Sequence, residues 1–220
     1  TLSLHDALPI LLKERADLTL GDDDPLDESI PLELAPLARW KAGDAMLASL
    51  RAGHSPEAVE TDQWLSGRLP PRRLGSAALR PLTATARTVH QSFLRVVGDA
   101  VPEVTAIDLD LDGVRLTGRL LTRAGQVAES HFGRVGPKHL AAAWVRQLAL
   151  TVQHGRRTDA VLVGDRGTRR LLAPPPDMAA QFLSDLLTLA GHGTERVLPM
   201  PPRVAQFWVE QRYQIGRAHV

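Results

Sequence analysis

The chain has 220 residues, 44% of them hydrophobic and 23% charged, which is typical of a globular protein with a sizeable core. Its 26 Lys and Arg nearly balance its 25 Asp and Glu, so the net charge of +1 by itself neither indicates nor excludes a nucleic-acid partner. The absence of cysteine excludes disulfides, thiolate metal sites and cysteine nucleophiles, and fits a bacterial cytoplasmic protein. No apolar run approaches the roughly 20 residues that span a bilayer, so no membrane segment is expected.

The two ends of the chain differ in character from the sequence between them. The first ten residues, TLSLHDALPI, and the last six, IGRAHV, resemble translated sequencing-adapter DNA. We therefore expect residues 1–10 and 215–220 to lie outside the fold, and the remainder to be an internal piece of a longer protein. Between them we expect a helical subregion over residues 11–74 and an α+β domain over residues 75–214.

The helical subregion begins with the end of a helix at residues 11–20, followed by an acidic stretch at residues 21–25. Three consecutive Asp could bind a metal, but on an extended chain they more often form a solvated loop, which we favour. Helices are predicted over residues 36–50 and from a Ser55 cap with Pro56 at the first position to near Gly67. The basic, proline-containing residues 68–73 fit equally a phosphate contact and a stiff connector.

A long helix is predicted next, because Leu79, Leu82, Ala86, Val89, Phe93 and Val96 recur at steps of three and four before Gly98. Three alternating segments follow at residues 107–111, 116–120 and 127–132, separated by Asp112-Gly113 and Ala124-Gly125 turns. They predict a three-stranded β-meander. A helix from Pro137, a hairpin over residues 160–173 and a helix over residues 178–190 come after it. Another helix is predicted to begin at Phe207.

The order helix, three strands, helix, strand is that of the PD-(D/E)-x-K nuclease core. Active members of that fold hold a divalent metal with an Asp on the second strand and a D/E-x-K tripeptide on the third. Here Leu121 stands where the Asp is expected, Glu129 is the one acidic residue of the tripeptide, and His131 takes the lysine position. One carboxylate is a poor ligand set for Mg²⁺, so we predict a degenerate nuclease site that binds no metal. The alternative is an active nuclease in which Asp108 or Asp110 assists Glu129 and His131.

Short motifs in a fixed order carry a resemblance that covers nearly all of residues 11–214. They are residues 24–28 with 37–40, residues 113–120, residues 137–140 with 144–150, residues 161–165, and residues 174–202. In this order they resemble the C-terminal region of RecC, the gamma subunit of exodeoxyribonuclease V. The match is only partial around Lys138 and His139, where family members often carry a second charged residue.

The resemblance implies a nuclease-like domain without catalysis inside the RecBCD helicase-nuclease. It implies RecB and RecD as partners, double-stranded DNA ends and separated single strands as ligands, and Mg²⁺ and ATP bound by the other subunits. Arg115, Arg119, Arg123 and Lys138 are the candidate contacts to DNA phosphates. Arg115 and Arg119 share a strand face, so pairing with Asp108 or Asp110 on the neighbouring strand is the slightly favoured alternative. A stand-alone binder of single-stranded DNA is a third interpretation.

Overall fold

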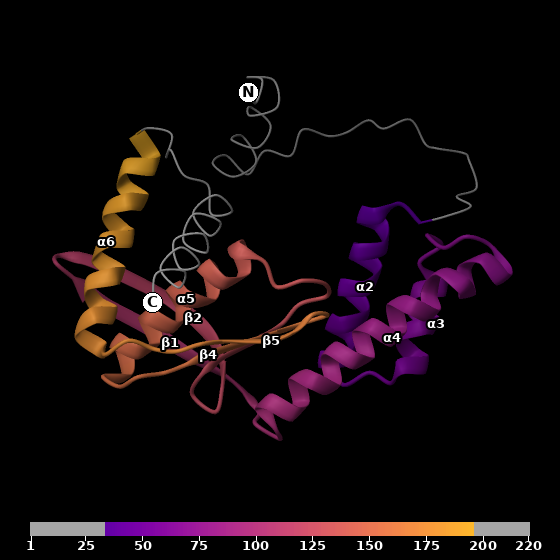
Figure 1. Ribbon diagram of the computed structural model, residues 1–220, viewed down its shortest axis with the longest axis horizontal. Helices are drawn as coiled ribbons and strands as arrows, with labels where there is room; N and C mark the ends of the chain where they lie inside the picture. The colour runs from indigo at the N-terminus through magenta and orange to yellow at the C-terminus, as the bar shows by residue number, and fades with distance from the viewer. Residues whose placement is uncertain (1–33, 196–220) are drawn as a thin grey trace, which may run out of the picture. The chain divides into compact units, whose positions relative to one another are not determined.

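The computed structural model describes residues 34–195 (Figure 1). The elements in chain order are α2 (Pro36–Arg51), α3 (Pro56–Leu65), α4 (Arg72–Val97), β1 (Pro102–Leu111), β2 (Val114–Arg123), β3 (Val127–Ser130), α5 (Pro137–His154), β4 (Ala160–Gly164), β5 (Gly167–Leu171) and α6 (Pro176–Glu195). The adapter-like ends, the acidic stretch at residues 21–25 and the helix predicted at Phe207 lie outside the described residues. None of the helices in the described part is long and apolar enough to cross a membrane.

The helices begin and end where local signals in the sequence place them. The Ser55 side chain accepts a hydrogen bond of 3.2 Å from the Ala58 amide and so caps α3, whose first residue is Pro56. At the other end of α5, Gly155 adopts the left-handed conformation with φ 62°, which glycine tolerates without a steric penalty. The predicted helix boundaries at these positions are confirmed.

Two details of the predicted helical region are wrong. The basic loop is shorter than residues 68–73, because α4 already begins at Arg72. The apolar stripe of α4 ends at the buried Val97, whereas Val96 is 37% exposed. A helix turns once every 3.6 residues, so the residue four after Phe93 returns to the same face and the residue three after it lies at the edge.

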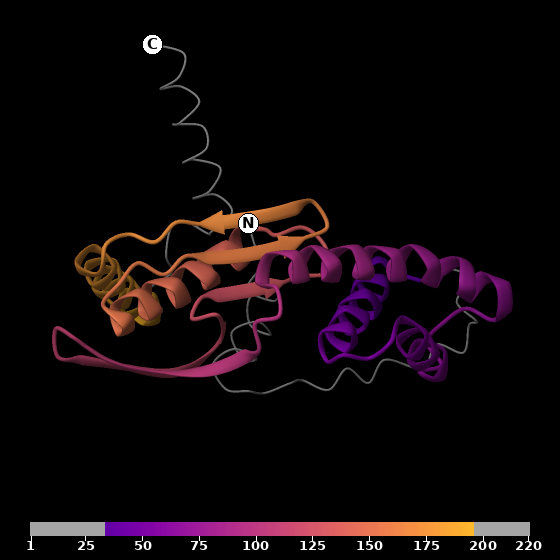
Figure 2. The same ribbon diagram turned by 90° about the horizontal axis from the view of Figure 1, so that it is seen from below.

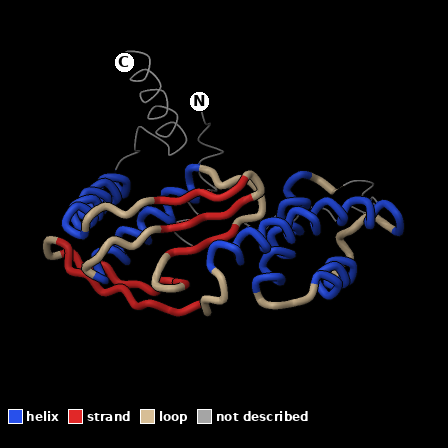
Figure 3. The backbone as a smooth tube through the Cα atoms, turned by 60° about the horizontal axis from the view of Figure 1, so that its bottom comes forward, coloured by secondary structure: helices blue, strands red, loops and turns tan. Residues whose placement is uncertain are grey.

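A three-stranded sheet forms the centre of the described chain (Figure 3). Its middle strand β4 runs parallel to β3 and antiparallel to β5, and all five of its residues are buried. Alternate side chains of β4 point to opposite faces: Val161 and Val163 join the apolar core of α2, α3 and α4, while Leu162 packs with Leu140 and Ala143 of α5. The sheet therefore separates two helical layers.

The predicted three-stranded meander does not form as one sheet. β1 and β2 pair with each other as a separate antiparallel hairpin, which Figure 2 shows as its own ribbon. The turn after β2 is closed by an isolated bridge between Arg123 and Gln126, the residue before β3. β3 pairs along its length with β4 instead. In β3, Val127 and Ser130 are buried. The sequence could not predict that β3 pairs with β4, because alternating hydrophobicity identifies a strand but not the strand it pairs with.

The hairpin is held to the rest of the fold by its apolar face. Ile107, Leu109 and Leu111 of β1 are buried in a second core with α5 and α6. Within that core the Trp144 and Phe182 rings lie 5.8 Å apart between centroids. The architecture is α+β with the predicted order of helices and strands, and this sheet and its two helical layers position the residues considered next.

Candidate functional site

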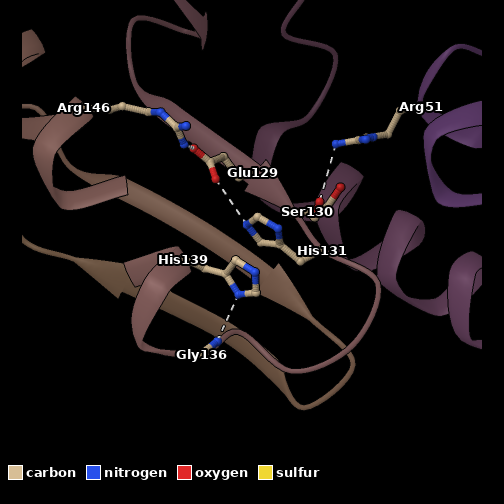
Figure 4. A network of polar contacts seen from close by, with 7 residues as sticks. All are labelled: Arg51, Glu129, Ser130, His131, Gly136, His139 and Arg146. Carbon is tan, nitrogen blue, oxygen red and sulfur yellow. Dashed lines mark hydrogen bonds and ion pairs between the residues drawn. The ribbon is translucent and has the colours of Figure 1, made fainter. Parts of the chain in front are cut away.

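The predicted degenerate site centres on Glu129, which lies on β3 and faces α5 (Figure 4). Its side chain is 21% exposed. Arg146 of α5 donates a hydrogen bond from Nη1 to Oε1 over 2.5 Å. His131 lies beyond the end of β3, and its Nε2 is 3.2 Å from Oε2 of the same carboxylate. Both carboxylate oxygens therefore already have partners within the chain.

The charged form of Glu129 is favoured by these partners. Burial of the side chain alone raises the pKa of the carboxyl group. The hydrogen bond from His131 and the positive charge and hydrogen bond of Arg146 act in the opposite direction, and together they hold the pKa below its ordinary value. Glu129 is thus an ionised group compensated by a guanidinium, rather than a carboxylate open to a cation.

A stacked pair of histidines adjoins the carboxylate. The rings of His131 and His139 lie 4.3 Å apart between centroids with 19° between their planes. The Gly136 amide donates a hydrogen bond of 3.1 Å to His139 Nδ1, at the start of α5. Burial first, and then the charges of His131 and Lys138, lower the pKa of His139. A neutral His139 fits its role as the acceptor of the Gly136 amide.

Leu121 lies on β2 as an exposed aliphatic side chain. It is 64% exposed, and its cross-strand partner Val104 is 67% exposed. Neither side chain carries an oxygen that could bind a metal. Across residues 34–195, no group of three or more His, Cys, Asp or Glu side chains could hold an ion. The residues at this position do not fit the divalent metal that the nuclease fold implies.

The candidate DNA contact Arg115 is already paired. Its Nε and Nη2 donate to the two carboxylate oxygens of Asp108 over 2.7 and 2.6 Å. Arg115 lies directly opposite Asp110 in the strand register, so the pair with Asp108 is diagonal. Cross-strand pairing, the favoured alternative for this residue, is confirmed. Both side chains are more than half exposed, so the pair contributes little to stability.

The other three candidate DNA contacts differ in their surroundings. The Arg123 guanidinium lies 5.5 Å from the centroid of the Phe93 ring and donates a hydrogen bond to the Ala100 carbonyl oxygen over 2.6 Å. These contacts give Arg123 a structural role between α4 and β2. Arg119 and Lys138 are exposed, and within the described chain neither forms an ion pair. Contact with DNA stays a prediction for all four residues, Arg115, Arg119, Arg123 and Lys138.

Sequence reasoning missed the residue that decides the chemistry of the site, Arg146. It lies on α5, 17 positions after Glu129, and no local pattern links the two. The predicted order of a strand followed by a helix was the one indication that Glu129 and Arg146 could meet. A strand followed by a helix that packs on it brings polar residues on the facing sides together.

The comparisons with known proteins agree with the ordered motifs. The family model described as the RecC C-terminal domain matches residues 9–213. The RecBCD enzyme subunit RecC of Mycobacterium tuberculosis is 32% identical over 205 residues, which cover 89% of this chain. The RecBCD enzyme subunit RecC of Mycolicibacterium smegmatis is 31% identical over 208 residues, or 90% of the chain. The matches span 18% and 19% of the lengths of these relatives.

Proposed function

Because the chain belongs to the RecC C-terminal domain family, we propose that it is a non-catalytic part of the RecC subunit of a RecBCD helicase-nuclease. In this role it acts in the bacterial cytoplasm in the repair of double-strand breaks by recombination. It supports the RecB and RecD subunits and lines part of the path of the DNA. Mg²⁺ and ATP are used by the other subunits.

One observation carries the non-catalytic part of the proposal, namely the state of Glu129. Phosphodiester hydrolysis with a bound metal needs carboxylate oxygens that are free to hold the ion. Here Arg146 and His131 occupy both oxygens, and Leu121 supplies none. The inactive nuclease fold remains our interpretation of the order of elements, and the chemistry of the donor set supports it.

A pair of variants tests whether the region catalyses hydrolysis. Glu129→Gln removes the carboxylate and with it the ion pair to Arg146. Arg146→Gln breaks the same ion pair but leaves the Glu129 carboxylate in place. The assembled complex carrying either variant is expected to degrade linear DNA with Mg²⁺ at a rate within about twofold of the unmodified complex. The measurement is nuclease rate per assembled complex, with the unwinding rate recorded in parallel.

The matched variants separate catalysis from structure. Equal, small effects of Glu129→Gln and Arg146→Gln are expected, since both loosen the contact between β3 and α5. Loss of nuclease activity with Glu129→Gln alone, at normal unwinding, would falsify the non-catalytic role. The active-nuclease interpretation would then take its place.

The scaffold role has its own experiment. Removal of the segment corresponding to this chain from the RecC subunit is expected to reduce the recovery of RecB and RecD in co-purification. Full recovery of both partners with the shortened subunit would contradict a role in supporting them.

A further inference from the structure

Three arginines from two separate parts of the fold surround one cavity. Arg156 and Arg157 follow the end of α5, and Arg170 lies on β5. The cavity has a volume of about 320 Å³, and its lining includes the turn between β2 and β3 at Ala124 and Gly125. None of the residues of the degenerate nuclease site lines it, so the cavity is a separate feature of the fold.

The charge around the cavity is strongly unbalanced. Asp159 is the single acidic residue of the lining, and this chain already occupies both of its carboxylate oxygens. Arg170 donates to Oδ2 from Nε over 3.0 Å, and the Ala173 amide donates to Oδ1 over 2.9 Å. Arg156 and Arg157 are exposed, and within residues 34–195 neither forms an ion pair. Their guanidiniums are available to an anion from outside the chain.

The negative end of the α5 dipole accounts for only part of this arrangement. A cation close to Gly155 compensates the last carbonyl groups of the helix, and Arg156 is placed to do so. Arg170 comes from another element and is held in place by Asp159. Three guanidiniums that line one cavity form a cluster of positive charge, and an anion bound there can accept charge-assisted hydrogen bonds from more than one of them.

The backbone of the β2–β3 turn forms one edge of the cavity. Ala124 and Gly125 both have positive φ, 50° and 69°, which is uncommon for alanine and marks a tight turn. A side chain at position 125 would begin 3.5 Å from Arg156 Nη2. This is an ordinary van der Waals distance, so the turn and the Arg156 guanidinium lie side by side at the edge of the cavity.

We propose that Arg156, Arg157 and Arg170 bind a phosphate group of a nucleic-acid strand. The fork of N–H donors on a guanidinium matches the oxygens of a phosphate, which accepts two hydrogen bonds at once. The lining offers Ala124 as its one aliphatic side chain and no aromatic anchor, whereas the centre of a protein interface is apolar. A sugar-phosphate backbone thus fits better than an acidic protein segment. The identity of the strand as DNA rests on the proposed function.

Cross-linking in the assembled complex with full-length RecC tests the site. The photoreactive residue p-benzoylphenylalanine replaces Gln126, which lines the cavity, and the probe is forked DNA with single-stranded tails. We expect a cross-link from position 126 to a DNA strand. Its yield should fall about tenfold in Arg156→Gln/Arg157→Gln and should decrease steeply as salt rises.

The control variant removes two positive charges at positions outside the cavity. Arg95→Gln/Arg134→Gln replaces two exposed arginines that do not line the cavity and should leave the yield within about twofold. A higher yield with 5′-phosphorylated than with 5′-hydroxyl strands would identify a terminal phosphate, and equal yields would identify backbone phosphodiesters. Either result supports the site.

Two results would overturn it. A cross-link to RecB or RecD in place of DNA would assign the cavity to an acidic protein segment. Normal unwinding of the forked DNA without a cross-link from position 126 would exclude contact between this cavity and the strand. Both results leave the proposed place in the RecBCD complex intact, since that is tested by co-purification and nuclease rate.

Discussion

Glu129 shows how one neighbour decides what a carboxylate does. In the sequence it is the one acidic residue left in a nuclease-like tripeptide. In the structure Arg146 neutralises it and His131 occupies its second oxygen. A charge that is mostly buried needs such a partner, because an unpaired one would be strongly destabilising. The two partners leave neither oxygen of Glu129 open to a cation.

The first prediction concerns the response of stability to acid. The pKa values of His139 and His90 are lowered from 6.5 mainly by burial, so below that pH the unfolded chain binds protons that the folded chain does not. Stability should therefore begin to fall as the pH drops below about 6.5. A second loss should follow below 4.5, because the pKa of Glu129 is also lowered in the folded state.

The measurement is the urea midpoint of the intact RecC subunit as a function of pH. Arg146→Gln removes a cause of the low pKa of Glu129, so it should reduce stability at neutral pH and make the loss below pH 4.5 smaller. A midpoint that does not change between neutral pH and pH 4.5 would rule out the contribution of the two histidines.

At the scale of elements, α2 packs against Phe132, which follows β3, and Gly43 lies at the contact. The Trp40 indole N–H donates a hydrogen bond of 2.9 Å to the Phe132 carbonyl oxygen, 92 positions away. One turn further along the helix, the Phe132 ring lies directly against Gly43. Glycine lowers helix propensity, and from the sequence alone Gly43 is only a weak point of the helix. In the structure the absence of a side chain at Gly43 makes room for the Phe132 ring.

The second prediction is that Gly43→Ala destabilises the packing of α2. Alanine improves helix propensity by about 1 kcal/mol, but its Cβ would overlap the Phe132 ring. Overpacking of this kind costs about 1–3 kcal/mol, so we expect a net loss. Hydrogen exchange of the α2 amides in the intact subunit should become faster.

Gly118→Ala is the matched control, because a Cβ at Gly118 meets no atom within 4 Å and this strand residue has an ordinary φ. It should leave α2 exchange unchanged. Slower exchange of α2 in Gly43→Ala would show that propensity outweighs the contact with Phe132.

At the scale of the whole described chain, β4 is the strand on which both helical layers depend. Its residues contribute to three apolar clusters, on both faces of the sheet. The loss of one large β4 side chain should therefore loosen elements that do not touch it directly. Tight packing transmits such a change because protein interiors leave few voids.

The third prediction is that Leu162→Ala lowers the stability of the subunit by about 2–5 kcal/mol. Leu162 is fully buried, so its truncation leaves a cavity between β4 and α5. Hydrogen exchange should accelerate in α5 and also in α4, on the opposite face of the sheet. Leu65→Ala, at a side chain 80% exposed, is the control and should change neither helix. Acceleration confined to α5 would mean that the two layers unfold independently.

The sequence by itself determined most of the local elements, the lack of a metal-binding oxygen at Leu121, and the family. The caps at Ser55 and Gly155 depend on residues a few positions apart, so a single sequence displays them fully. The stripe of α4 was also visible in the sequence, apart from its last residue. An aliphatic side chain cannot bind a metal in any fold. Only the tertiary structure decided that β3 pairs with β4, that Arg146 meets Glu129, and that Arg170 joins Arg156 and Arg157 around a cavity. These contacts join residues far apart in the chain, and packing and burial select them from many sterically allowed pairings.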